Sequence, residues 1–109
     1  MRILLDEHLN IRLHRVFEDE FEVETVAYRG WKGVANGDLL QRAADEYDGF
    51  LTFDRGIPHQ QNIEALRLRC IVMKAQSDDY EDLAPLIPRV ENAFLDMAPG
   101  GVRYVEAPA

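Results

Sequence analysis

Two aspartates, Asp6 and Asp54, are the residues of this sequence best placed to do chemistry. Each comes at the end of a short apolar run, residues 3–5 in one case and residues 50–53 in the other. Runs this short and this apolar are typical of buried strands in a parallel sheet. Ligands and catalytic groups gather at the carboxyl ends of such strands. We therefore expect both carboxylates at one edge of the sheet, with Glu7 beside Asp6.

The ligand that such acids favour is a divalent cation. Asp38 opens a predicted helix that should start at the same edge, so the expected acids are Asp6, Asp38 and Asp54, with Glu7 as a fourth. Mg²⁺ and Mn²⁺ take oxygen ligands of this kind. Carboxylates that converge without a cation raise one another's pKa. A bound cation relieves that repulsion, activates water and stabilises a phosphodiester during in-line displacement.

Each acid also has a purely structural interpretation. Asp38 would be favourable at a helix N-terminus through capping and the helix dipole alone. Asp54, close to Gly56, would suit a turn, and Glu7 would be a solvated neighbour. Asp6, at the end of a buried strand, is the hardest of the acids to explain by structure alone.

Four polar residues near the same edge are candidates for substrate contact. Arg55 would bind phosphate or pair with an acid. His8 would orient a metal-bound water or contact the substrate, although a lone histidine is more often a packing residue. Gln61 and Asn62 would contact a ligand, hydrogen-bond the loop that carries Asp54, or solvate a short helix.

The apolar patterns predict an α/β fold, a Rossmann-like α/β/α sandwich around a mainly parallel sheet of five strands in a single domain, residues 1–109. Strands are expected at residues 1–5, 22–26, 50–53, 68–73 and 102–105. Helices are expected after Asn10, from Asn36 or Gly37 up to a stop at Gly49, from Pro58 to about Leu66, and within residues 80–97. Right-handed crossovers favour the strand order 2-1-3-4-5, with the second strand at an edge.

Two segments carry specific expectations. Pro88 should kink or break the last helix, which is expected to start late or to come in two pieces. The glycine-rich loop at residues 27–37 also contains Arg29, Lys32 and the only tryptophan, Trp31. Trp31 would either cover the edge of the core or make a surface contact.

The composition indicates a small domain that does not attract nucleic acid by its overall field. The chain has 109 residues and a formal net charge of −8, so an RNA partner would depend on bound metal and local arginines. No apolar segment is long enough to cross a membrane, and the first predicted strand leaves no room for a signal peptide. Cys70, the single cysteine, lies in an apolar run; we expect it in the core of a cytoplasmic protein.

Most of the sequence resembles a compact bacterial branch of the PIN-like domain family. The resemblance lies in three stretches, MRILLDEHL, NGDLLQRA and FLTFDRGIPHQQN. It implies a Rossmann-like sandwich with an acidic pocket like that of magnesium- or manganese-dependent ribonucleases. It carries Asp6, Asp38 and Asp54 over as pocket acids, and Glu7 less directly. Some members of this branch are regarded as toxins of toxin–antitoxin pairs.

Three functions are compatible with these features. The first is a metal-dependent endoribonuclease with an RNA substrate; a small antitoxin partner and a homodimeric assembly are compatible with it. The second is a non-catalytic PIN-like binding protein. The family's acidic pocket is often completed by an acid from late in the chain, and here only Asp78 and Asp79 are loose matches for it, which favours this second function. The third is a phosphorylated receiver domain, which has the same strand order. A receiver expects a hydroxyl residue after the fourth strand and a lysine after the fifth, whereas this chain has Lys74 and Ala75 after the fourth and no lysine beyond Lys74.

Overall fold

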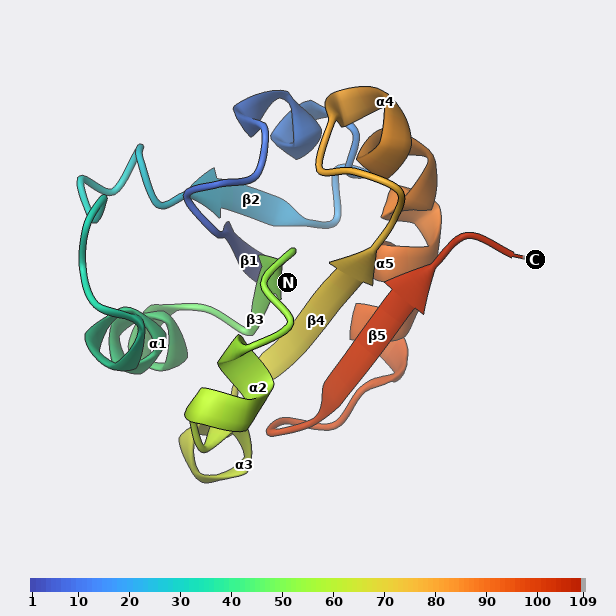
Figure 1. The fold of residues 1–109 in the computed structure, drawn as a ribbon. Helices are drawn as coiled ribbons and strands as arrows, with labels where there is room; N and C mark the ends of the chain where they lie inside the picture. The colour runs from blue at the N-terminus through green and yellow to red at the C-terminus, as the bar shows by residue number, and fades with distance from the viewer. Residues whose placement is uncertain (109) are drawn as a thin grey trace.

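A computed structural model describes residues 1–108 and has the predicted parallel sheet at its centre (Figure 1). The strand order is β2-β1-β3-β4-β5, and every neighbouring pair is parallel. The strands are β1 (Arg2–Leu5), β2 (Glu22–Thr25), β3 (Gly49–Thr52), β4 (Arg69–Lys74) and β5 (Val102–Glu106). Leu5 of β1 pairs with Leu51 of β3. The residues that follow these two strands therefore leave the sheet side by side, as the sequence predicted.

Helices cover both faces of the sheet, which confirms the predicted fold class (Figure 1). One face carries α1 (Asn36–Glu46), α2 (Ile57–Gln60) and α3 (Ile63–Leu66), and the other carries η1 (Ile11–Arg15), α4 (Tyr80–Leu83), η2 (Ala84–Leu86) and α5 (Ile87–Asp96). Alternate residues of a strand point to opposite faces, so Leu4 packs in the first core and Leu5 in the second. Cys70 is buried and unpaired, as predicted. None of the helices within residues 1–108 has the length and apolar character needed to traverse a bilayer.

The predicted helix after Asn10 is a short 3-10 helix rather than a regular amphipathic α-helix. Asn10 caps it as expected, because its Oδ1 accepts a hydrogen bond from the backbone N of Arg12 at 2.9 Å. Leu13 is the only buried residue within it, so tertiary packing supports little more than one turn. Its last turn carries basic residues, which suit a helix C-terminus, and the acids at positions 18–20 lie beyond it.

Prolines and polar residues divide the other predicted helices. The last helix comes in three pieces, α4, η2 and α5, rather than two, and Pro88 lies in the first turn of α5, where proline is tolerated. The segment at residues 57–66 likewise forms two single turns, α2 and α3, which meet at Gln61 and Asn62. Asn62 caps α3 by accepting a hydrogen bond from the backbone N of Ala65 at 3.2 Å.

Gly49 opens β3 instead of ending the preceding helix, so that part of the prediction is wrong. A Cβ at this position would lie 2.5 Å from Cε1 of Phe94 and 2.9 Å from Cδ1 of Ile3. The side chains of Phe94 and Ile3 would therefore have to move if any residue larger than glycine stood at position 49. Glycine is therefore required here by close packing between β3 and α5.

The glycine-rich loop is held against the core by Trp31. The Arg29 guanidinium lies 4.2 Å from the centre of the Trp31 ring and donates a hydrogen bond to the Tyr47 hydroxyl at 2.6 Å. Trp31 itself packs against the core beside α1. Of its two predicted roles, the structure supports cover for the edge of the core.

Candidate functional site

A cavity of about 230 Å³ lies at the carboxyl ends of the strands. It is lined by Asp6, His8, Leu9, Phe53, Asp54 and Asp78. Its three aspartates follow β1, β3 and β4, which are neighbours in the sheet. The predicted meeting of Asp6 with Asp54 is therefore present, and a third acid joins them.

Asp6 is held by the sheet although it lies just beyond β1. Its backbone N donates to the carbonyl of Leu51 at 3.0 Å, and the residue is only 7% exposed. Burial raises the pKa of the Asp6 carboxyl above its usual range, because desolvation disfavours the charged form. Hydrogen bonds from Thr52 and from the backbone N of Glu7, and the nearby His8, act in the opposite direction and lower this pKa.

Thr52 links the two aspartates that the sequence singled out. Its buried hydroxyl donates to Oδ2 of Asp6 at 2.7 Å and accepts from the backbone N of Asp54 at 3.0 Å. Asp54 also forms the turn that was its structural interpretation, since its Oδ1 accepts from the backbone N of Gly56 at 2.8 Å. The structural and the functional interpretations of Asp54 are thus compatible. Its Oδ1 stabilises the turn, and the turn places Asp54 in the lining of the cavity.

Asp78 was only a loose candidate from the sequence, and the structure places it in the cavity. It lies in the connection between β4 and α4, one residue after Ser77, whose hydroxyl donates to Asp82 and accepts from the backbone N of Asp79. The signal for it was its position after the buried run of β4. Phe53 and Leu9, which form apolar walls of the cavity, carried no comparable signal.

Five of the predicted site residues do not line this cavity. Asp38 is exposed in the first turn of α1, where helix-terminal electrostatics explain an acid. Glu7 contributes its backbone N to Asp6, Asn62 caps α3, and Arg55 is exposed beside Asp54. Gln61 lies near the start of α1, because its Oε1 would be 3.5 Å from a Cβ built on Gly37. Of the predicted substrate-binding residues, only His8 lines the cavity.

The donors of the cavity suit a hard cation by their chemistry, since its polar lining is mainly carboxylate. Asp54 uses only its Oδ1 in hydrogen bonds within residues 1–108. The arrangement of the donors is looser than a complete metal site. Over that same range, no three His, Cys, Asp or Glu side chains are grouped closely enough to hold a metal ion.

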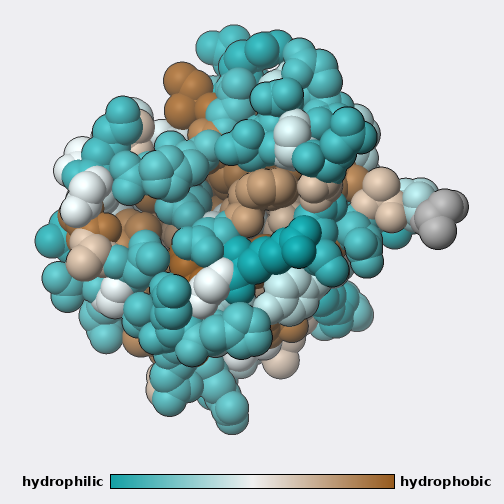
Figure 2. All heavy atoms as spheres, in the orientation of Figure 1, coloured by the Kyte–Doolittle hydropathy of each residue, from teal (hydrophilic) through white to brown (hydrophobic). Residues whose placement is uncertain are grey.

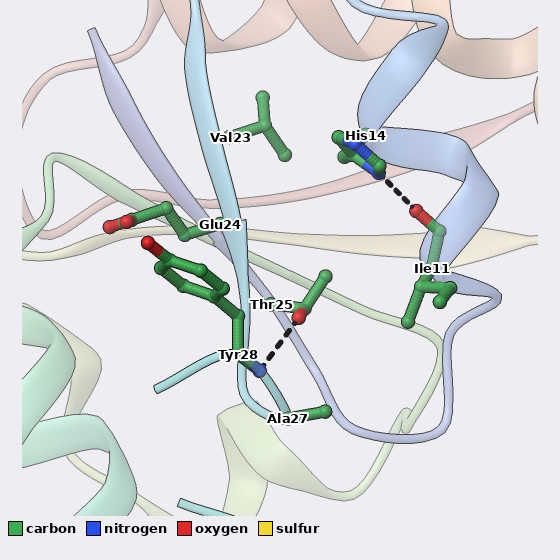
Figure 3. Close-up of a pocket in the computed structure, with 7 residues that line it drawn as sticks. All are labelled: Ile11, His14, Val23, Glu24, Thr25, Ala27 and Tyr28. Atoms are coloured by element: carbon green, nitrogen blue, oxygen red, sulfur yellow. Dashed lines mark hydrogen bonds between the residues drawn. The ribbon is translucent and has the colours of Figure 1, made fainter. Parts of the chain in front are cut away.

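A second, larger cavity of about 570 Å³ lies away from these acids, beside η1 and β2 (Figure 3). Its lining is mainly apolar and contains a single carboxylate, that of Glu24. Its volume is within the range of small-molecule sites, but carboxylate chemistry belongs to the smaller cavity. The face of the molecule in Figure 2 is mostly hydrophilic, with apolar atoms visible in a recess near its centre, at its upper edge and on its left side.

Comparison of the chain with family models, with curated proteins and with solved structures gives no match. The resemblance to PIN-like domains therefore stays a prediction from the motifs.

Proposed function

We propose that this protein is a metal-dependent ribonuclease of the PIN-like kind, with Mg²⁺ or Mn²⁺ as its cofactor. The observation that carries the proposal is the convergence of Asp6, Asp54 and Asp78 on one cavity from three neighbouring strands. Carboxylates gathered in this way, at the carboxyl ends of parallel strands, favour a divalent cation and a phosphate-containing ligand. A small antitoxin as a further partner belongs to the same proposal.

The chain's own residues would divide the work as follows. Asp6, fixed by Thr52 and by the backbone of Glu7, would be the rigid ligand, and Asp54 and Asp78 would be more adaptable ones from exposed turns. When bound, the cation would supply activation of water and stabilisation of charge on the phosphodiester. Asp38 and Glu7, assigned to the cation from the sequence, would act at most from outside the cavity.

A second candidate function is favoured by the looseness of the acidic cluster. A non-catalytic PIN-like protein would keep the cavity as a cation or partner site without completing a catalytic set. The position of Asp38 outside the cavity and the lack of a close group of three ligands within residues 1–108 both fit that alternative.

The test is cleavage of a labelled, mixed-sequence single-stranded RNA with Mn²⁺, with Mg²⁺ or with a chelator. The variants are Asp6→Asn, Asp54→Asn and Asp78→Asn, and the matched control is Asp45→Asn, which changes an exposed acid in the second half of α1. We expect metal-dependent cleavage that each cavity variant lowers by about 100-fold and that the control leaves unchanged.

Two outcomes separate the candidates. Mn²⁺ binding measured by calorimetry, lost in Asp6→Asn but accompanied by no RNA cleavage, would favour the binding protein. Equal activity in the wild type and all three cavity variants would show that the cleavage comes from elsewhere, and would overturn the assignment of the site.

A further inference from the structure

The outer edge of β2 is an open side of the sheet with a cavity beside it. Within residues 1–108, β2 pairs only with β1. The cavity, of about 570 Å³, lies between η1, β2 and the turn that follows it (Figure 3). Edges of this kind are usually covered or blunted, since their unpaired backbone groups can pair with another chain.

The backbone of β2 offers hydrogen-bonding groups on its outer side. Glu22 donates its backbone N to Met1, and Val26 donates to Leu5, so these alternate residues face β1. By the two-residue period of a strand, the amides of Val23 and Thr25 face outward. The carbonyl of Thr25 accepts from the backbone N of Arg29, so the Val23 amide and carbonyl and the Thr25 amide are the groups that remain for a partner.

Large apolar side chains stand on either side of this edge. Ile11 of η1 is 58% exposed and Tyr28 is 76% exposed, and both line the cavity. Figure 3 shows Ile11 across the cavity from Thr25, close to the carboxyl end of β2. An apolar patch next to open backbone groups combines the two features that a bound strand uses, main-chain hydrogen bonds for affinity and a pocket for a side chain.

Charge selects the kind of partner. Five acids and no base occur in residues 18–24: Glu18, Asp19, Glu20, Glu22 and Glu24. Arg2 pairs with Glu22 at 3.3 Å and with Glu24 at 2.9 Å, and Arg12 and Arg15 lie on the neighbouring η1. The five acids still outnumber these three arginines. A second copy of the chain paired through β2 would bring the same acids against one another, which is unfavourable. A basic segment would be complementary.

We infer that the β2 edge binds an extended, basic segment of another protein as an added strand. One large apolar side chain of that segment would enter the cavity between Ile11 and Tyr28, and its basic side chains would lie over the start of β2. The inference is independent of the proposed ribonuclease activity, because none of these residues lines the acidic cavity.

The probe is a fluorescein-labelled seven-residue peptide that alternates lysine with leucine and valine, titrated by fluorescence anisotropy. Ile11→Asp and Tyr28→Ala change exposed residues of the cavity, and Leu95→Asp is the matched control because Leu95 is also apolar and 55% exposed but lies on α5. We expect each cavity variant to weaken binding about tenfold and the control to leave it unchanged.

Four further measurements make the result decisive. The same peptide with N-methylated backbone should bind more weakly, and its glutamate counterpart should not bind. In NMR hydrogen exchange, the peptide should protect the amides of Val23 and Thr25. Equal binding to all variants, with no protection of those two amides, would mean general attraction of lysine to an acidic protein and would overturn the inference. Dimerisation of the free protein that Ile11→Asp abolishes would identify a second copy as the occupant and overturn it as well.

Discussion

Replacement of Thr52 by valine tests the link between the two central aspartates. Valine has nearly the shape of threonine, so Thr52→Val removes the hydroxyl from a fully buried site without opening a large cavity. Two hydrogen bonds are lost, the one donated to Asp6 at 2.7 Å and the one accepted from the backbone N of Asp54 at 3.0 Å. The first goes to a buried carboxylate and the second joins neutral groups.

The magnitude follows from these two bonds. A hydrogen bond to a charged group contributes about 1.5–3 kcal/mol and a neutral one about 0.5–1.5 kcal/mol. Asp54 is exposed, so water can replace the bond to its backbone N. We therefore take the contribution of this second bond from the lower end of its range. We expect the free energy of unfolding to fall by about 2–4 kcal/mol at neutral pH, and Tm to fall by roughly 10–30 °C.

The loss should depend on pH in a definite direction. The Thr52 bond lowers the pKa of Asp6, against a larger opposing effect of burial, so its removal raises that pKa further. When the folded state raises the pKa of a carboxyl, the protonated carboxyl does not destabilise the fold. The free energy of unfolding then falls as the pH rises through the folded-state pKa and the carboxyl becomes charged. The deficit of Thr52→Val should therefore be largest at neutral pH and shrink as Asp6 becomes protonated in mild acid.

Urea unfolding followed by Trp31 fluorescence and circular dichroism, at neutral and mildly acidic pH, measures both quantities. Thr25→Val is the control for loss of a threonine hydroxyl, because within residues 1–108 the half-buried Thr25 hydroxyl accepts from the backbone N of Tyr28 at 3.0 Å and bonds to no carboxylate. We expect it to cost at most about 1 kcal/mol, with no matching pH dependence. A Thr52→Val protein as stable as the control, or a deficit that does not change with pH, would refute the assignment of a charge-assisted bond to Asp6.

Three other changes have expected outcomes. Gly49→Ala should lower the free energy of unfolding by about 1–3 kcal/mol in urea titrations, because the new Cβ meets Phe94 and Ile3 within 3 Å. Cys70, whose thiol pKa is raised to about 12 by burial and by the nearby Asp6, should react with a disulfide reagent at mildly alkaline pH only as fast as the protein unfolds; rapid reaction of the folded protein would contradict its burial. Asp6→Asn should be at least as stable as the wild type in metal-free buffer at neutral pH. The difference in the free energy of unfolding should grow as the pH rises through the folded-state pKa of Asp6. Mn²⁺ should raise the Tm of the wild type but not that of Asp6→Asn.

The sheet and the position of its two principal acids were predictable because both depend on simple patterns. Short apolar runs identify buried strands, and right-handed crossovers leave few strand orders for five of them. Once the order is known, Asp6 and Asp54 must emerge at one edge, since Leu5 and Leu51 are paired. Neither step depends on the details of the loops.

The remaining site residues depended on loop geometry, which sequence patterns specify poorly. Asp78 lines the cavity from the connection between β4 and α4, in which Ser77 donates a hydrogen bond to Asp82. Asp38 stays outside because it belongs to the first turn of α1. Asn62 was predicted to contact a ligand, but its side-chain oxygen caps α3 by accepting a hydrogen bond from the backbone N of Ala65.

Asp6 and Glu91 are the two buried acids in residues 1–108, and neither belongs to an ion pair there. The ion pairs in the described part of the chain involve Glu22, Glu24, Glu46 and Asp96. Asp6 is buried, and its carboxylate accepts hydrogen bonds from the Thr52 hydroxyl and from the backbone N of Glu7 rather than from an arginine or lysine. A buried carboxylate without an arginine or lysine partner is unfavourable for folding, and such groups tend to persist where function needs them. A cation shared with Asp54 and Asp78 would balance that charge, which is why the stability of the wild type, and not that of Asp6→Asn, should respond to Mn²⁺.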